Sequence, residues 1–135
     1  MKQAIANGLI DALATDHAPH LQSEKELEFL TAPFGIASLE CALSLYIKAL
    51  IEPGILDWPD LIRLMTANPA KIIGVDKGTL GVGKQADVII IDPEAEYKID
   101  VNTFHSKSRN CPYHGWMVKG KVEKTIVSGE IRFET

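Results

Sequence analysis

The densest group of chemically capable side chains lies near the start of the chain, in the hexapeptide Thr15-Asp16-His17-Ala18-Pro19-His20. A carboxylate and two imidazoles so close together could bind a divalent metal or share a proton. The same residue types also occur in ordinary turns whose polar groups are hydrogen-bonded. Spacing alone favours a functional site and an ordinary turn about equally. A catalytic zinc needs three protein ligands. Because the other histidines, His105 and His114, lie far along the chain in expected surface loops, the sequence predicts an incomplete metal site.

Two stretches follow the hexapeptide closely in sequence. Pro33-Phe34-Gly35 is predicted to form a turn, in which Gly35 lets the backbone approach another group closely. The charged run from Glu24 to Glu28 is predicted to be a solvated face.

The elements that would position these residues are those of an α/β unit. The hexapeptide follows a short apolar run, residues 10–15, which fits a buried strand but is too short to be distinguished from a helix. A helix would end before it at Asn7-Gly8, since glycine suits the left-handed cap. The carboxyl ends of strands carry the chemistry in α/β barrels, which favours a functional role for the hexapeptide.

Three further helices are predicted between residues 36 and 74. The first spans residues 36–51 and ends at Pro53-Gly54. The second begins with Asp57 as its cap, and the third with Asn68 as its cap; Gly74 ends the third. The apolar face of the first helix is predicted to consist of Leu39, Leu43, Tyr46, Ile47 and Leu50.

The residue pattern changes near Gly74 from one typical of helices to one typical of strands, so Gly74 is the predicted domain boundary. Strands are predicted at residues 86–91, 116–118 and 122–127, with Asp92-Pro93 stopping the first of them. Ser128-Gly129 is predicted to be the two-residue turn of a final hairpin.

Composition excludes several classes of protein. With 46% apolar and 24% charged residues, the chain is expected to be globular. A net charge of -4 makes nucleic acid and anionic membranes poor partners. Cys41 and Cys111 form no C-x-x-C pair, and no signal peptide or 20-residue apolar run is visible. We therefore expect a cytoplasmic protein with reduced cysteines.

The hexapeptide resembles the late motif of bacterial class I dihydroorotases, which are amidohydrolases. The resemblance extends in order over nearly the whole chain. The other matching residues are Gly8 to Ala14, Lys25-Glu26, Ala32 to Ile36, Leu39-Glu40, Asn68 to Ile72, Gly74, Gly78 to Leu80, Gly83, Ala86-Asp87, Asp92, Gly120 to Val122, Thr125, Val127 and Gly129.

The resemblance implies a fold and a reaction. Residues 1–74 would be the last strand and terminal helices of a metal-dependent hydrolase (β/α)₈ (TIM) barrel. Residues 75–135 would be the C-terminal strands of a small β-sandwich domain. Dihydroorotase interconverts L-dihydroorotate and N-carbamoyl-L-aspartate in pyrimidine biosynthesis, with zinc activating the attacking water.

Site residues follow from the same resemblance. Asp16 matches the metal ligand and catalytic carboxylate that carries a proton to the leaving nitrogen. His20, Phe34 and Gly35 match substrate-binding residues, and His17 is given a supporting role.

Departures from the family pattern limit what this chain can do alone. This chain lacks the early His-x-His-x-Arg motif of the family. It also lacks the family's later carboxylate or lysine ligand and its two further metal-binding histidines. Cys111 stands where the family usually has threonine. We therefore expect the chain by itself to bind no zinc and to be inactive, although the resemblance implies that the parent protein is an enzyme acting on a small molecule.

Three alternatives stay open from the sequence. The parent could be a dihydroorotase, or another cyclic amidase of the allantoinase or hydantoinase type. It could also be a non-catalytic scaffold that binds a partner such as aspartate transcarbamoylase. In each case a lone barrel strand leaves open edges, so we expect association with a missing N-terminal portion or self-association.

Overall fold

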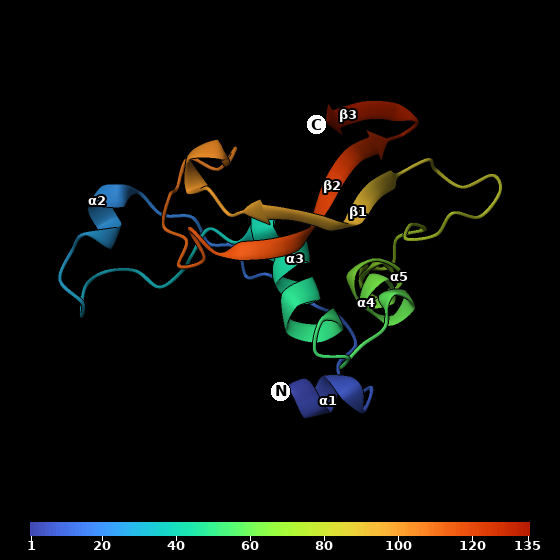
Figure 1. Cartoon of the computed structure of the whole chain (residues 1–135), viewed down its shortest axis with the longest axis horizontal. Coiled ribbons are helices and arrows are strands. Elements are labelled where there is room, and N and C mark those ends of the chain that lie inside the picture. The colour runs from blue at the N-terminus through green and yellow to red at the C-terminus, as the bar shows by residue number, and fades with distance from the viewer.

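Short helices and a three-stranded antiparallel sheet make up the chain, which a computed structural model describes over all residues, 1–135 (Figure 1). The paired strands β1 and β2 lie across the central helix, with two further helices on one side and a looped extension on the other. The elements are α1 (Lys2–Ala6), α2 (Gln22–Lys25), η1 (Leu39–Cys41), α3 (Ala42–Tyr46), η2 (Ile47–Ile51), α4 (Trp58–Met65), α5 (Ala67–Ile73), β1 (Val88–Lys98), η3 (Val101–Thr103), β2 (Met117–Val127) and β3 (Glu130–Glu134).

The central helix begins three residues later than predicted. A 3₁₀ turn, η1, starts it at Leu39, and the last turn widens into the π-helix η2. Ile36 stays extended because it pairs with His17 in an isolated parallel bridge. Ile47 and Leu50 are buried as predicted, whereas Leu39 is 59% exposed, so its place on the apolar face was wrong.

Capping chemistry sets the ends of the next two helices. Asp57 Oδ1 accepts the backbone N–H of Asp60 at 2.9 Å, which confirms it as the cap of α4. Gly74 ends α5 with φ 74°, also as predicted. The predicted cap Asn68 was wrong, because it lies inside the first turn of α5 and its amide donates instead to the carbonyl of Asp11 at 2.8 Å.

The sheet is longer and more continuous than predicted. Strand β1 does not stop at Asp92-Pro93, because Asp92 Oδ1 accepts the backbone N–H groups of Glu94 and Ala95 and so stabilises a bulge. Pairing with β2 resumes at Glu96. The two predicted strands 116–118 and 122–127 form the single strand β2. Ser128-Gly129, with φ 54° and 83°, makes the predicted hairpin turn.

The core is small and divided in two. One cluster joins α1, η2 and α4 through Ile5, Ile47, Leu50, Leu61 and Leu64. The other joins the start of the central helix to the sheet and its loops through Cys41, Ile99, Val101, Cys111 and Val118. Only 17 of 135 residues are buried, which is little for a chain of this length.

The apolar run at residues 10–15 has no regular secondary structure and joins no ladder, so the predicted strand is absent from the sheet. One backbone-to-backbone hydrogen bond ties it to another element, from the Leu13 N–H to the carbonyl of Leu64 at 3.0 Å. No helix is both long and apolar enough to cross a membrane.

Candidate functional site

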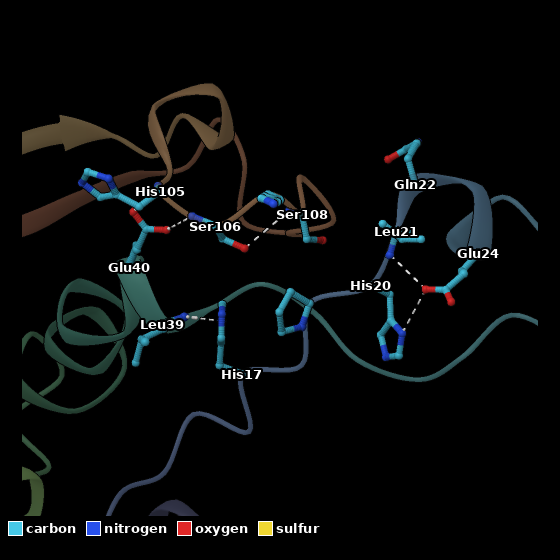
Figure 2. A pocket seen from close by; sticks show the side chains of 12 residues that line it. His17, His20, Leu21, Gln22, Glu24, Leu39, Glu40, His105, Ser106 and Ser108 are labelled. Atoms are coloured by element: carbon cyan, nitrogen blue, oxygen red, sulfur yellow. Dashed lines mark hydrogen bonds and ion pairs between the residues drawn. The ribbon is translucent and has the colours of Figure 1, made fainter.

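A cavity of about 700 Å³ opens beside the hexapeptide (Figure 2). His17, Pro19 and His20 contribute one part of its wall, and Leu39 and Glu40 contribute another. The remaining wall includes residues 105–108, which come from the loop between η3 and β2. Residues far apart in the sequence thus meet around one space, and three of the four histidines line it.

Asp16 does not line this cavity. Its backbone has φ 47°, in the left-handed region that aspartate tolerates better than most residues. Its side chain is exposed and makes no hydrogen bond or ion pair within the chain. The structure therefore presents Asp16 as a free carboxylate at the end of the extended segment, apart from His17 and His20.

His17 is held by the start of the central helix. Its Nδ1 accepts the backbone N–H groups of Ser38 and Leu39, each at 3.1 Å. The Ser38 hydroxyl in turn donates to the carbonyl of Thr15 at 3.2 Å. Because Nδ1 is an acceptor, the proton of the neutral ring lies on Nε2. His17 thus ties the hexapeptide to the helix.

His20 lies beside the turn that contains Gly35. Its Nδ1 is 3.4 Å from Glu24 Oε2, an oxygen that also accepts the Leu21 N–H at 3.0 Å. A Cβ at Gly35 would lie 2.6 Å from the carbonyl oxygen of Ala18 and 3.1 Å from His20 Cδ2. The predicted close backbone approach at Gly35 is confirmed, and residues 18–20 are what it approaches.

The Gly35 carbonyl is held from two sides. Lys25 Nζ donates to the carbonyls of Pro33 at 2.6 Å and Gly35 at 3.2 Å. Asn110 Nδ2 donates to the same Gly35 oxygen at 2.9 Å. Lys25 was predicted to lie on a solvated face, but it is half-buried and orders the turn. Phe34, by contrast, is 97% exposed.

Glu40 and the loop 105–108 were missed as site residues. The Glu40 carboxylate accepts the His105 N–H at 2.8 Å and the Ser106 N–H at 3.0 Å (Figure 2). The His105 side chain is exposed, as predicted for a loop. No sequence signal joins Glu40 to residues 65 positions away. His114 lies elsewhere, where its Nδ1 accepts the Val101 N–H at 3.2 Å.

The residues present do not fit a metal centre on their own. No three side chains of histidine, cysteine, aspartate or glutamate converge closely enough to hold an ion. Asp16 stands alone, the Nδ1 of His17 is engaged by two amides, and His20 faces Glu24. What this chain offers is one free carboxylate, a histidine beside a tight glycine turn, and a cavity wall.

Comparison with known proteins agrees with this partial site. The amidohydrolase family pattern matches residues 1–132. The dihydroorotase of Citrifermentans bemidjiense is 48% identical over 99% of the chain, which spans 31% of that relative. The dihydroorotase of Caldanaerobacter subterraneus subsp. tengcongensis is 46% identical over 98% of the chain, which spans 30% of that relative.

Solved structures show the same relation. The L-hydantoinase (dihydropyrimidinase) of Arthrobacter aurescens superimposes with a TM-score of 0.91 at 33% identity, over 98% of this chain and 31% of that one. The dihydropyrimidinase of Brevibacillus agri gives a TM-score of 0.92 at 26% identity, over 98% of this chain and 30% of that one. The chain thus spans about 31% of the length of proteins whose local fold it shares.

Proposed function

Because this chain belongs to the amidohydrolase family, we propose that it is the C-terminal part of a dihydroorotase, a cytoplasmic enzyme of pyrimidine biosynthesis. The reaction is the reversible hydrolysis of L-dihydroorotate to N-carbamoyl-L-aspartate. One observation carries the choice of substrate: the 48% identity to a dihydroorotase over 99% of the chain. The chain alone is inactive in this proposal, and the rest of the parent protein completes it.

The proposed architecture divides the chain at residue 74. Residues 1–74 supply the last strand and terminal helices of a (β/α)₈ barrel, and residues 75–135 supply strands of the β-sandwich. The unpaired extended backbone of residues 10–15 supports this division, because a barrel strand needs neighbours on both edges. The position of the hexapeptide after this segment matches the carboxyl end of a barrel strand, where active sites lie.

Asp16 is the proposed catalytic residue. Hydrolysis forms a bond from the oxygen of water to the ring carbonyl carbon, breaks the ring C–N bond and adds a proton to the nitrogen. A free carboxylate can take a proton from the water and give it to the leaving nitrogen. The proposal includes zinc in the complete enzyme, with Asp16 as the one ligand that this chain offers.

His20, Phe34 and Gly35 are the proposed substrate-binding residues. The carbonyl of Gly35 is occupied by Lys25 and Asn110, while its N–H has no partner within the chain. That N–H is therefore available to a substrate oxygen. The close contact between the Gly35 turn and His20 supports placing both against the same ligand.

The test is complementation. The chain is expressed with the remaining two thirds of a related dihydroorotase, and dihydroorotate hydrolysis and zinc content of the purified complex are measured. Asp16→Asn is expected to lower kcat by at least roughly 100-fold. The matched control, Asp11→Asn, changes a second exposed aspartate on the same extended segment and is expected to leave kcat unchanged.

A hydantoinase or dihydropyrimidinase is the second candidate, favoured by the solved structures that share this fold. The same complex is assayed with a 5-substituted hydantoin and with dihydrouracil. Turnover of these substrates without turnover of dihydroorotate would replace the first proposal. A stable complex that turns over none of them would indicate the scaffold role.

A further inference from the structure

The two cysteines of the chain lie in contact inside the second core cluster. Their Sγ atoms are 4.0 Å apart, although 70 positions separate them in the sequence. Cys41 is 1% exposed and Cys111 is 8% exposed. Both are free thiols.

Hydrogen bonds on either side hold the two thiols together. Residues 35–41 and 105–111 run beside each other, and we call this contact the seam. The Ala37 N–H donates to the Asn110 carbonyl at 2.8 Å, and the Asn110 amide donates to the carbonyl of Gly35 at 2.9 Å. At the other end Glu40 accepts the N–H groups of His105 and Ser106. The thiols therefore stay close without depending on their own contact.

We propose that Cys41 and Cys111 are a modification site, which a low-molecular-weight disulfide such as oxidised glutathione converts into an intramolecular disulfide across the seam. The thiolate of Cys111, the more exposed of the two, attacks the reagent and releases one reduced glutathione. The Cys41 thiolate then displaces the second glutathione from Cys111. Two protons and two electrons leave the protein, and the reagent is reduced to two thiols.

The geometry requires only a small movement. A disulfide places its sulfurs about 2 Å apart, so the side chains must close by about 2 Å from their present contact. Burial and the neighbouring Cys111 thiol raise the pKa of Cys41 to about 12. The Cys41 thiol is therefore protonated near neutral pH, and it reacts with a disulfide more slowly than an exposed cysteine would.

Closing this bond would fix one wall of the cavity. It would tie the helix start beside Glu40 to the loop that supplies residues 105–108, and it would immobilise Asn110, which holds the Gly35 carbonyl. The inference stands on thiol chemistry alone and does not depend on the proposed enzymatic activity.

The experiment counts thiols and measures thermal stability. The reduced 135-residue chain is brought to equilibrium with a mixture of oxidised and reduced glutathione, natively and in denaturing urea, then alkylated in denaturant, and its mass is measured. We expect a product with the mass of one chain, no alkylated thiol and no bound glutathione, and an equilibrium constant for its formation at least roughly tenfold larger in the native state than in urea. Closing the loop should raise Tm by roughly 5 to 15 °C, and dithiothreitol should reverse this rise.

Two single variants provide the controls. Cys41→Ser and Cys111→Ser each keep one thiol, so the oxidant should leave the Tm of both unchanged. Two free thiols after native treatment, a glutathione adduct on Cys111 alone, or disulfide-linked dimers would each overturn the proposal. Equal disulfide formation in native and denatured chains would do the same, because the fold would then contribute nothing.

Discussion

At Gly35 the absence of a side chain allows two loops of the candidate site to touch. Its φ is 127°, and an added Cβ would lie 2.6 Å from the Ala18 carbonyl oxygen and 2.8 Å from the Ala18 Cβ. Gly35→Ala is therefore expected to lower the free energy of unfolding by about 2 kcal/mol or more, because backbone must move and strain is added. Urea unfolding of the variant measures this loss.

Gly54 is the matched control. It also has a positive φ, 68°, but nothing lies within 4 Å of the position of its Cβ. Gly54→Ala should lower the free energy of unfolding by only about 1 kcal/mol. If both variants lose the same free energy of unfolding, backbone strain alone accounts for the effect of Gly35→Ala, and the contact with residues 18–20 contributes nothing.

The Cys41 thiol makes stability depend on alkaline pH. Its pKa rises from 9.0 to about 12 in the folded chain, first through burial and then through Cys111, with Glu40 adding a small contribution. Burial raises the pKa of Tyr97, and the neighbouring Cys41 thiol adds to that rise. Below pH 9.0 both states are protonated and the stabilisation is fully present. Between pH 9.0 and about 12 only the unfolded thiol ionises, so stability is lost as pH rises.

Urea unfolding of the reduced chain at about pH 8 and about pH 10.5 checks this. Between these two pH values the free energy of unfolding should fall by about 2 kcal/mol more in the wild type than in Cys41→Ser. The comparison isolates Cys41, because the tyrosines and lysines are present in both proteins. Identical pH profiles for the two proteins would contradict a raised pKa at Cys41.

Among the elements, one side chain at the start of the central helix bonds the backbone of residues 105 and 106. Glu40 accepts two backbone N–H groups there, from His105 and Ser106. Glu40→Ala should speed hydrogen exchange at these two amides by roughly tenfold and lower the free energy of unfolding by about 1 to 2 kcal/mol. Glu52→Ala is the control, because the exposed Glu52 side chain makes no hydrogen bond. It should change neither the hydrogen exchange at residues 105 and 106 nor the free energy of unfolding. Unaltered exchange at residues 105 and 106 would count against the role of Glu40.

Elements whose ends depend on local chemistry could be predicted from the sequence. The cap at Asp57, the left-handed Gly74 and the Ser128-Gly129 turn need only their immediate neighbours. The bulge at Asp92 was missed because an Asp-Pro pair normally ends a strand, and here the carboxylate stabilises the irregular backbone instead.

The candidate site was predictable only where its residues are adjacent in sequence. The hexapeptide and the Gly35 turn stand out as motifs, and the resemblance supplied their expected roles. Asn110 and Glu40 could not be found, because each acts on a segment at least 65 positions away and a single sequence shows no pairing between distant positions. For the same reason the contact between Cys41 and Cys111 was invisible.

The whole molecule exposes far more apolar surface than a stable monomer usually does. Phe29 and Leu30 are each 93% exposed and Phe34 is 97% exposed, while 17 of 135 residues are buried. We therefore expect the isolated chain to associate with itself, and to form a one-to-one complex when the remaining two thirds of a related dihydroorotase is present. Sedimentation velocity over a range of concentrations distinguishes these states, and a compact monomer at every concentration would contradict the expectation.

The seam also has a consequence for the order in which a ribosome makes this chain. Asn110, which orders the Gly35 turn, is 75 positions downstream of it. At about 5–20 residues per second, synthesis reaches Asn110 roughly 4 to 15 seconds after Gly35 has been added. Throughout that interval the nascent chain carries the turn with Lys25 but without Asn110, the second of the two residues that hold the Gly35 carbonyl. The contact between Asn110 and the Gly35 turn thus forms only after β1 has been made and before β2 has been made.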